Sequence, residues 1–175
     1  MSSSDLSEHY TCCEKKKCSP LTALQIQQDD KWITRCLTIL KNQKEHEEVP
    51  IAALIVDQNN HCIAEACNQP ITLSDPTAHA EIRAIRIACQ QQKNYRLSHC
   101  TLYTTLEPCG MCFNALMQAR IQRIVFSCPD KKLGILSQKR YLETHSTCNH
   151  HFTWSSGLQA EENEKILINF FKSRR

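Results

Sequence analysis

The pattern of hydrophobic and polar residues predicts alternating helices and strands from about residue 24 onward. Between residues 24 and 44, apolar side chains recur every three or four positions, as in a helix with one face against a core. Residues 51–56 form an unbroken apolar run, which is typical of a strand covered on both faces. The polar turn 57–60 separates this strand from another at 61–67, so the two are predicted to form a hairpin.

The second half of the chain continues this alternation. Thr77 is a suitable N-cap for a helix that runs to about residue 91, with its apolar residues on one face. A threonine-rich strand at 100–106 is followed by a helix that Pro108 is predicted to start. The remaining predicted elements are a strand at 124–126, a short helix near 138–143, an edge strand at 152–155 and a helix at 160–172. Strands that alternate with helices predict an α/β fold.

Length and composition fit one folded domain. Residues 1–22 are polar, rich in serine and without periodicity, so we expect a flexible N-terminal extension followed by a single domain over residues 23–175. The net charge of +3 is too small to indicate nucleic-acid binding by itself. No apolar run is long enough to span a bilayer and no signal peptide opens the chain. We therefore expect a cytoplasmic protein in a reducing compartment, with no membrane partner.

The chain has twelve cysteines, but a chain of this length does not need a disulfide framework. Those outside the motif described below are expected to be mostly small buried hydrophobic residues. Two clusters offer metal-binding side chains, namely Cys12, Cys13 and Cys18, and His145, Cys148, His150 and His151. The first lacks a partner histidine or second cysteine pair at ligand spacing, so a solvated tail is the simpler interpretation. For the second, a loop whose polar groups meet water is simpler.

Two short motifs carry the candidate chemistry: Pro76-Thr77-Ala78-His79-Ala80-Glu81 and Glu107-Pro108-Cys109-Gly110-Met111-Cys112. His79, Cys109 and Cys112 provide three ligands that suit a catalytic zinc ion, which leaves its fourth position to water. Zinc lowers the pKa of bound water from near 16 to about 7. Glu81 is placed to carry protons from that water to a ring nitrogen and to a leaving amine.

A lone C-x-x-C pair is a weak signal, because redox pairs and halves of structural zinc sites share it. Here no second C-x-x-C stands at zinc-ribbon spacing, and a redox pair would not explain His79 and Glu81. The combination of H-x-E with P-C-x-x-C is the signature of zinc-dependent nucleobase deaminases. We therefore predict one zinc ion (Zn2+) per subunit, with Glu81 as the catalytic proton shuttle.

Beyond these motifs, the chain from about Val49 to its C-terminus resembles the bacterial tRNA-specific adenosine deaminases of the cytidine deaminase-like superfamily. The segments that carry the likeness are Asn68-Gln69-Pro70, Asp75–Ile82, Asn94-Tyr95-Arg96-Leu97, Thr101-Leu102-Tyr103, Thr105–Cys109, Ile124-Val125-Phe126 and Phe170-Phe171 with its basic tail. Gln69, Phe113 and Leu133 are among the positions that depart from the family's pattern. The resemblance implies a three-layer α/β/α sandwich around a mixed five-stranded sheet, and a homodimer. It also implies conversion of the wobble adenosine of an arginine tRNA anticodon to inosine, with release of ammonia.

The same resemblance implies which side chains meet the anticodon stem-loop. Asn68 would hold the flipped nucleotide, and Asp130 would contact sugar hydroxyls near the target. The other implied RNA contacts are Lys132, Phe170, Phe171, Arg174 and Arg175. Extruding a base from an anticodon loop, whose bases are already splayed, costs less than from a duplex. For the two phenylalanines, core packing of the last helix is an equally open interpretation.

Two other functions stay open at this point. A deaminase of a free base or nucleotide, such as guanine, cytosine or deoxycytidylate, would use the same motifs, although a small substrate needs no aromatic and basic C-terminal helix. A non-catalytic partner subunit would keep the fold without the chemistry. Such a subunit can lack the glutamate of the first motif, and Glu81 is present here.

Overall fold

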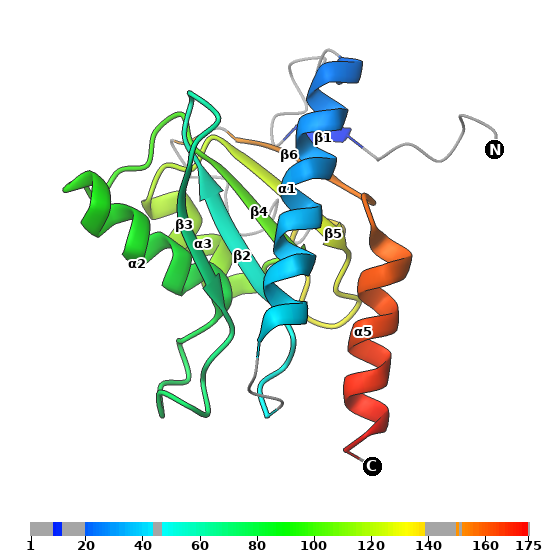
Figure 1. The fold of residues 1–175 in the computed structure, drawn as a ribbon. Helices are drawn as coiled ribbons and strands as arrows, with labels where there is room; N and C mark the ends of the chain where they lie inside the picture. The colour runs from blue at the N-terminus through cyan, green and yellow to red at the C-terminus, as the bar shows by residue number, and fades with distance from the viewer. Residues whose placement is uncertain (1–8, 12–19, 44–46, 139–149, 151, 175) are drawn as a thin grey trace.

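The computed structural model describes residues 9–11, 20–43, 47–138, 150 and 152–174. The elements in chain order are β1 (His9–Thr11), α1 (Ala23–Asn42), β2 (Ala52–Val56), β3 (Cys62–Cys67), α2 (Ala80–Gln92), β4 (Thr101–Leu106), α3 (Gly110–Gln118), β5 (Arg123–Cys128), β6 (Thr153–Ser156) and α5 (Ala160–Lys172). Helices α1 and α5 cover one face of the sheet, and α2 and α3 cover the other (Figure 1). The predicted α/β/α sandwich is thereby confirmed. None of the described helices has the length and apolar character that crossing a membrane requires.

The sheet is mixed, with the strand order β1-β6-β5-β4-β2-β3. Strand β2 pairs antiparallel with β3 and β4, whereas β4, β5 and β6 run parallel to one another. All five residues of β2 are buried. Ala53 and Ile55 belong to the core on the α2 and α3 side, while Ala52 and Leu54 belong to the core under α1. The apolar run at 51–56 is therefore covered on both faces, as predicted.

Strand β1 is an addition that the sequence pattern did not predict. His9–Thr11 pairs antiparallel with β6, from His9 opposite Ser155 to Thr11 opposite Thr153. These three residues differ from the flexible extension expected over residues 1–22, and they add a sixth strand to the predicted five. A three-residue strand is too short for hydrophobic alternation to reveal it. Outside the described residues lie Cys12, Cys13, Cys18, His145, Cys148, His151 and nearly all of the short helix predicted at 138–143.

The core accommodates the bulky side chain of Phe113, one of the positions that depart from the family pattern. Phe113 is 1% exposed, and its ring meets that of Phe152 edge-on with the centroids 5.4 Å apart. Leu133, by contrast, is 60% exposed. The first departure thus affects packing inside the α2 and α3 layer, and the second affects the surface.

A buried ion pair joins α1 to the central strands. The carboxylate of Asp29 accepts hydrogen bonds from Nη1 of Arg123 at 2.7 Å and from the hydroxyl of Tyr103 at 2.8 Å. The side chain of Asp29 is 1% exposed and that of Arg123 is 11% exposed, so water screens neither charge well. Removal of either partner would leave a buried charge uncompensated.

Asp29→Ala is therefore expected to lower the free energy of unfolding by about 3 to 5 kcal/mol, because Arg123 stays buried without its partner. Urea denaturation of the two proteins measures this difference. The double variant Asp29→Ala/Arg123→Met removes both charges and is expected to recover part of the loss. If the double variant is no more stable than Asp29→Ala, the stranded charge is not the cause.

Candidate metal centre and active site

The three predicted zinc ligands lie at the N-termini of two helices. His79 is the N-cap of α2 and Cys109 is the N-cap of α3, each with an extended backbone. Cys112 lies in the first turn of α3 and is fully buried. The positive ends of both helix dipoles and the unpaired N–H groups of their first turns therefore face the same region, which favours negatively charged ligands there.

Both helices begin two residues later than the sequence predicted. The carboxylate of Asp75 accepts hydrogen bonds from the backbone N–H and the hydroxyl of Thr77, at 2.8 and 2.7 Å. These bonds close a separate turn, so Thr77 is not the N-cap and His79 takes that position. Pro108 likewise lies before α3, whose N-cap is Cys109. The two caps place metal-ligand side chains where a capping side chain would otherwise stand.

The ligand atoms are spaced as three corners of a zinc tetrahedron. The two Sγ atoms of Cys109 and Cys112 are 3.7 Å apart, and Nδ1 of His79 lies 3.7 Å from the first and 3.5 Å from the second. Zn–S bonds of about 2.3 Å and Zn–N bonds of about 2.0 Å at tetrahedral angles give S···S distances of about 3.8 Å and S···N distances of about 3.5 Å. The donor set and its spacing both fit zinc and leave one corner for another ligand.

The thiols of Cys109 and Cys112 differ in how readily they lose a proton. Hydrogen bonding with Cys112, and then with His79, lowers the pKa of Cys109 to about 4. The same contact with Cys109, together with burial, raises the pKa of Cys112. The pKa of His79 is raised, first by its hydrogen bond with Cys109. A divalent cation bound between the two sulfurs displaces the protons that they carry and binds them as thiolates.

Glu81 lies beside this group and is 4% exposed. Burial raises the pKa of its carboxyl group to about 7, the charge of Cys109 adds to the rise, and the charge of His79 opposes it. None of the ion pairs formed by the described residues involves Glu81. A buried carboxyl group with a pKa near neutrality can both accept and donate a proton.

Asn68 is buried next to the segment that carries the histidine. Its backbone N–H donates to the carbonyl of Ile51 at 2.9 Å, and the N–H of Gln69 donates to the carbonyl of Ala78 at 3.0 Å. Ala78 directly precedes His79. The chain after β3 is therefore tied both to the start of β2 and to the metal-ligand segment, which places Asn68 close to the candidate site.

Asp130 and Lys132 lie on the loop that follows β5. One carboxylate oxygen of Asp130 accepts the backbone N–H groups of Lys132 and Leu133, at 2.8 and 3.1 Å, and so forms a turn within the loop. A backbone bridge joins Gly134 of this loop to Cys109. The loop therefore lies beside the metal centre, with the side chain of Lys132 exposed.

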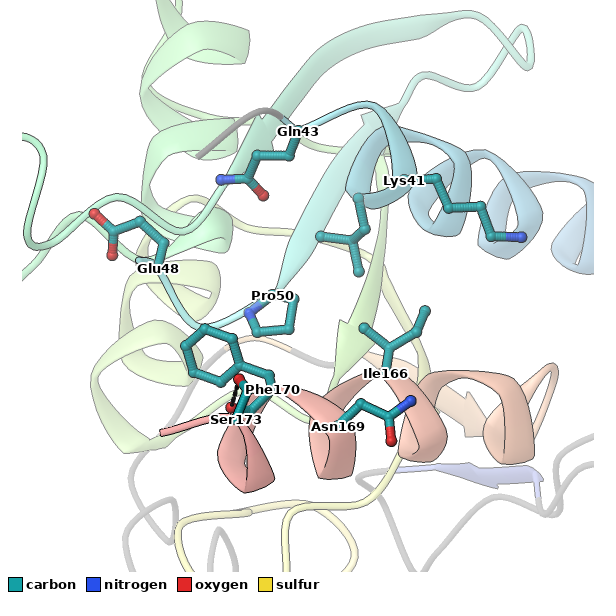
Figure 2. Close-up of a pocket in the computed structure, with 9 residues that line it drawn as sticks. Lys41, Gln43, Glu48, Pro50, Ile166, Asn169, Phe170 and Ser173 are labelled. Carbon is teal, nitrogen blue, oxygen red and sulfur yellow. Dashed lines mark hydrogen bonds between the residues drawn. The ribbon is translucent and has the colours of Figure 1, made fainter. Parts of the chain in front are cut away.

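The aromatic and basic residues of α5 have different environments. Phe170 is half-buried and lines a hollow of ≈ 440 Å³ between the end of α1, the segment 48–50 and α5 (Figure 2). The guanidinium of Arg174 lies 4.5 Å from the centre of the Phe170 ring. Phe171 is 51% exposed. Packing thus accounts for part of Phe170. The Phe171 ring meets that of Phe170 edge-on, with the centroids 5.3 Å apart, and leaves the rest of its surface to solvent. Arg175 lies outside the described residues.

Glu107 belongs to the second motif, but the sequence suggested no role for it. Its side chain is 2% exposed and accepts hydrogen bonds from the loop after β5. Its position in the sequence could have indicated a structural role. An acidic residue directly after a strand that is buried on both faces needs hydrogen-bond donors for its carboxylate. The partners come from distant parts of the sequence and could not be named from it.

Comparisons with known proteins bear on this site. A family model, the cytidine and deoxycytidylate deaminase zinc-binding region, matches residues 26–128. The tRNA-specific adenosine deaminase of Haemophilus influenzae is 40% identical over 147 residues, which cover 84% of this chain and 85% of that protein. The tRNA-specific adenosine deaminase of Aquifex aeolicus is 41% identical over 135 residues, which cover 77% of this chain and 88% of that protein. The chain belongs to the tRNA-specific adenosine deaminase family.

Solved structures agree with this family assignment. A structure from a study of A-to-I editing by tRNA:A34 deaminases at the wobble position of transfer RNA matches with a TM-score of 0.72 and 37% identity. The match covers 78% of this chain and 99% of that one. The structure of guanine deaminase from Bacillus subtilis is also 37% identical, but its TM-score is 0.54. That match covers 57% of this chain and 64% of the guanine deaminase chain. In the present chain, the H-x-E and P-C-x-x-C motifs both lie within the region that matches the zinc-binding family model. The chain is therefore a zinc-binding deaminase.

Proposed function

We propose that this deaminase converts the wobble adenosine of a tRNA anticodon to inosine, with an arginine tRNA as the first candidate substrate. The observation that carries the proposal is the tetrahedral spacing of His79, Cys109 and Cys112 with the buried carboxyl group of Glu81 beside them. Similarity to named tRNA-specific adenosine deaminases along most of the chain supports the choice of substrate.

Zinc, when bound by the three ligands, supplies a water whose pKa is lowered to about 7. Glu81 accepts a proton from the attacking water and delivers it to N1 of the adenine ring. It then passes the second proton to the amine that leaves C6. The C–O bond at C6 forms with the first proton transfer and the C–N bond breaks with the second, so one water is consumed and one ammonia is released. Asn68, buried beside the histidine segment, holds the extruded nucleotide in this proposal.

The stem-loop is proposed to lie over the loop after β5 and the C-terminal end of α5. Lys132, Arg174 and Arg175 would neutralise phosphates, and Asp130 would contact sugar hydroxyls. The exposed ring of Phe171 offers a stacking surface for an unpaired base, and Phe170 borders the hollow beside it. Aromatic and cationic side chains together are typical of proteins that bind single-stranded nucleic acid.

A deaminase of a free base or nucleotide is the second candidate, because guanine deaminase from Bacillus subtilis shares the fold at the same identity. Two observations favour RNA over it. The tRNA:A34 deaminase structure matches a larger share of this chain, 78% against 57%. A free base also leaves the exposed Phe171 and its basic neighbours without a purpose.

Incubation of zinc-loaded protein with an anticodon stem-loop, and separately with free adenosine, guanine and cytidine, tests the proposal. Inosine is expected from the stem-loop alone, and product is measured by nucleoside chromatography. The affinity for RNA should fall steeply with salt, because each phosphate contact contributes about 0.7 to 0.9 to the slope of log K against log salt. Efficient turnover of guanine or cytidine instead would establish the second candidate. RNA turnover that is insensitive to salt would count against the basic residues as phosphate contacts.

We also propose that the working unit is a cytoplasmic homodimer. Met111 and Leu133 support this, since they lie next to the bridge between Cys109 and Gly134 and are 38% and 60% exposed. Apolar side chains exposed beside a functional site are typical of an interface. Light scattering of the purified protein should give twice the mass of one chain, and a monomer mass at micromolar concentration would refute the dimer.

A further inference from the structure

Glu107 is a buried carboxylate that the proposed chemistry does not use. Its side chain is 2% exposed, and no ion pair among the described residues includes it. Oε1 accepts the backbone N–H groups of Leu136 at 2.7 Å and Ser137 at 2.8 Å. Oε2 accepts the N–H of Asp130 at 3.0 Å and the hydroxyl of Ser137 at 2.6 Å. Four donors thus satisfy this carboxylate, and hydrogen bonds to a charged acceptor are about twice as strong as neutral ones.

All four donors belong to the segment 130–137, and they come from its two ends. Between those ends, the N–H of Gly134 donates to the carbonyl of Asp130 at 3.0 Å, and Gly134 also forms the backbone bridge to Cys109. A Cβ atom at Gly134 would collide with the carbonyl oxygen of Asp130 and with Oε2 of Glu107. The segment therefore closes tightly over Glu107 and requires glycine at this point.

This anchoring fixes two cations relative to the metal ligands. Lys131 and Lys132 are exposed and lie between the anchored ends of the segment. Glu107 itself stands two residues before Cys109, with a rigid proline between them. The carboxylate of Glu107 therefore links two parts of the chain. One is the turn that carries Cys109, and the other is the loop that carries the positive charges of Lys131 and Lys132.

We propose that Glu107 is a positioning residue, which holds the segment 130–137 so that its lysines meet RNA phosphates while the target base lies at the zinc centre. The identity of the ligand rests on the proposed function. If Glu107 served stability alone, its loss would leave the number of phosphate contacts unchanged. Because it orients the lysines, its loss should instead reduce the salt dependence of RNA binding.

The test measures stem-loop binding across a salt series for zinc-loaded wild type, Glu107→Gln, Lys132→Ala and the double variant. Glutamine keeps the shape of the side chain but turns its amide NH2 group, itself a donor, toward two of the four donors. Lys132→Ala alone should reduce the slope of log K against log salt by about 1. Glu107→Gln should reduce the slope by at least as much as Lys132→Ala does. In the double variant, Lys132→Ala should reduce the slope no further. Zinc content should stay at one per chain in every variant.

Asp29→Asn is the matched control, because it perturbs a buried carboxylate at the opposite end of β5 and should keep the wild-type slope. Three results would each overturn the positioning role. They are a wild-type slope in Glu107→Gln, an undiminished effect of Lys132→Ala in the Glu107→Gln background, and loss of zinc from Glu107→Gln. If Glu107→Gln does not fold, Ser137→Ala replaces it in the test, because it removes one of the four donors. A reduced slope in Ser137→Ala would support the positioning role, and an unchanged slope would overturn it. Wild-type protein that fails to deaminate the stem-loop would refute the proposed function instead.

Discussion

Glu81→Gln is expected to lower kcat on an anticodon stem-loop by about 1,000-fold, because positioned proton transfer contributes about 10² to 10⁴ to the rate of such reactions. Glutamine has nearly the same volume and fits the buried position, but it cannot take a proton from water and pass it on. The zinc content should stay at one per chain, because the ligand atoms of His79, Cys109 and Cys112 are unchanged. Single-turnover formation of inosine measures the chemical step, and stem-loop affinity measured in parallel should change little.

Glu65→Gln is the matched control for this prediction. Glu65 forms an ion pair of 2.7 Å with Arg35, and the two side chains are 32% and 49% exposed. Exposed pairs of this kind contribute about 0 to 1 kcal/mol, so the control should retain the wild-type activity and zinc content. Full turnover by Glu81→Gln would remove the proton-shuttle assignment. Loss of zinc together with activity would mean that Glu81 supports the ligand set rather than the proton transfers.

The sequence predicted best those elements whose apolar residues follow a clear pattern along the chain. The last helix was predicted at residues 160–172 and spans Ala160–Lys172. The apolar run at 51–56 contains β2, with both faces buried as expected. Burial on both faces explains the apolar run of β2. Along the last helix, Ile166, Leu167 and Phe170 are only partly buried, but their helical spacing was a sufficient signal.

The starts of α2 and α3 could not be predicted from local preference. Threonine is a good N-cap residue, but Asp75 binds both donors of Thr77 and leaves the cap position to His79. The cap positions of His79 and Cys109 run against local preference, because neither makes a side-chain capping hydrogen bond. Residues that break a local rule in this way are expected at functional sites, where chemistry and not propensity selects the side chain.

Partners far apart in the sequence account for the remaining differences. The hydrogen bonds of Glu107 reach residues 23 to 30 positions away, and the pair of Asp29 and Arg123 spans 94 positions. Both carboxylates were visible in the sequence as acidic residues, but nothing local identifies their donors. The convergence of the metal ligands was predictable because the H-x-E and P-C-x-x-C motifs are known to occur together, whereas the distances between their atoms required the fold.

Cys112→Ser is expected to abolish stoichiometric zinc binding and, with it, deamination. The side chain of Cys112 is fully buried and its Sγ lies 3.7 Å from that of Cys109 and 3.5 Å from Nδ1 of His79. A serine hydroxyl is a harder and much less acidic donor than a thiol, so it replaces a thiolate poorly at a zinc centre. Bound zinc at 1,000 times its Kd stabilises the folded state by about 4 kcal/mol, which this variant should lose. Metal analysis and thermal unfolding with and without added zinc measure the two effects.

Cys36→Ser separates loss of a ligand from loss of a buried cysteine. Cys36 is also fully buried, and its thiol donates to the carbonyl of Tyr103 at 3.7 Å, a bond that a serine hydroxyl can make as well. This control should keep its zinc and its zinc-dependent rise in Tm, even if its baseline Tm falls. Stoichiometric zinc in Cys112→Ser would show that the ligand set is wrong. Equal loss of zinc in both variants would show that metal binding depends on overall stability rather than on the sulfur of Cys112.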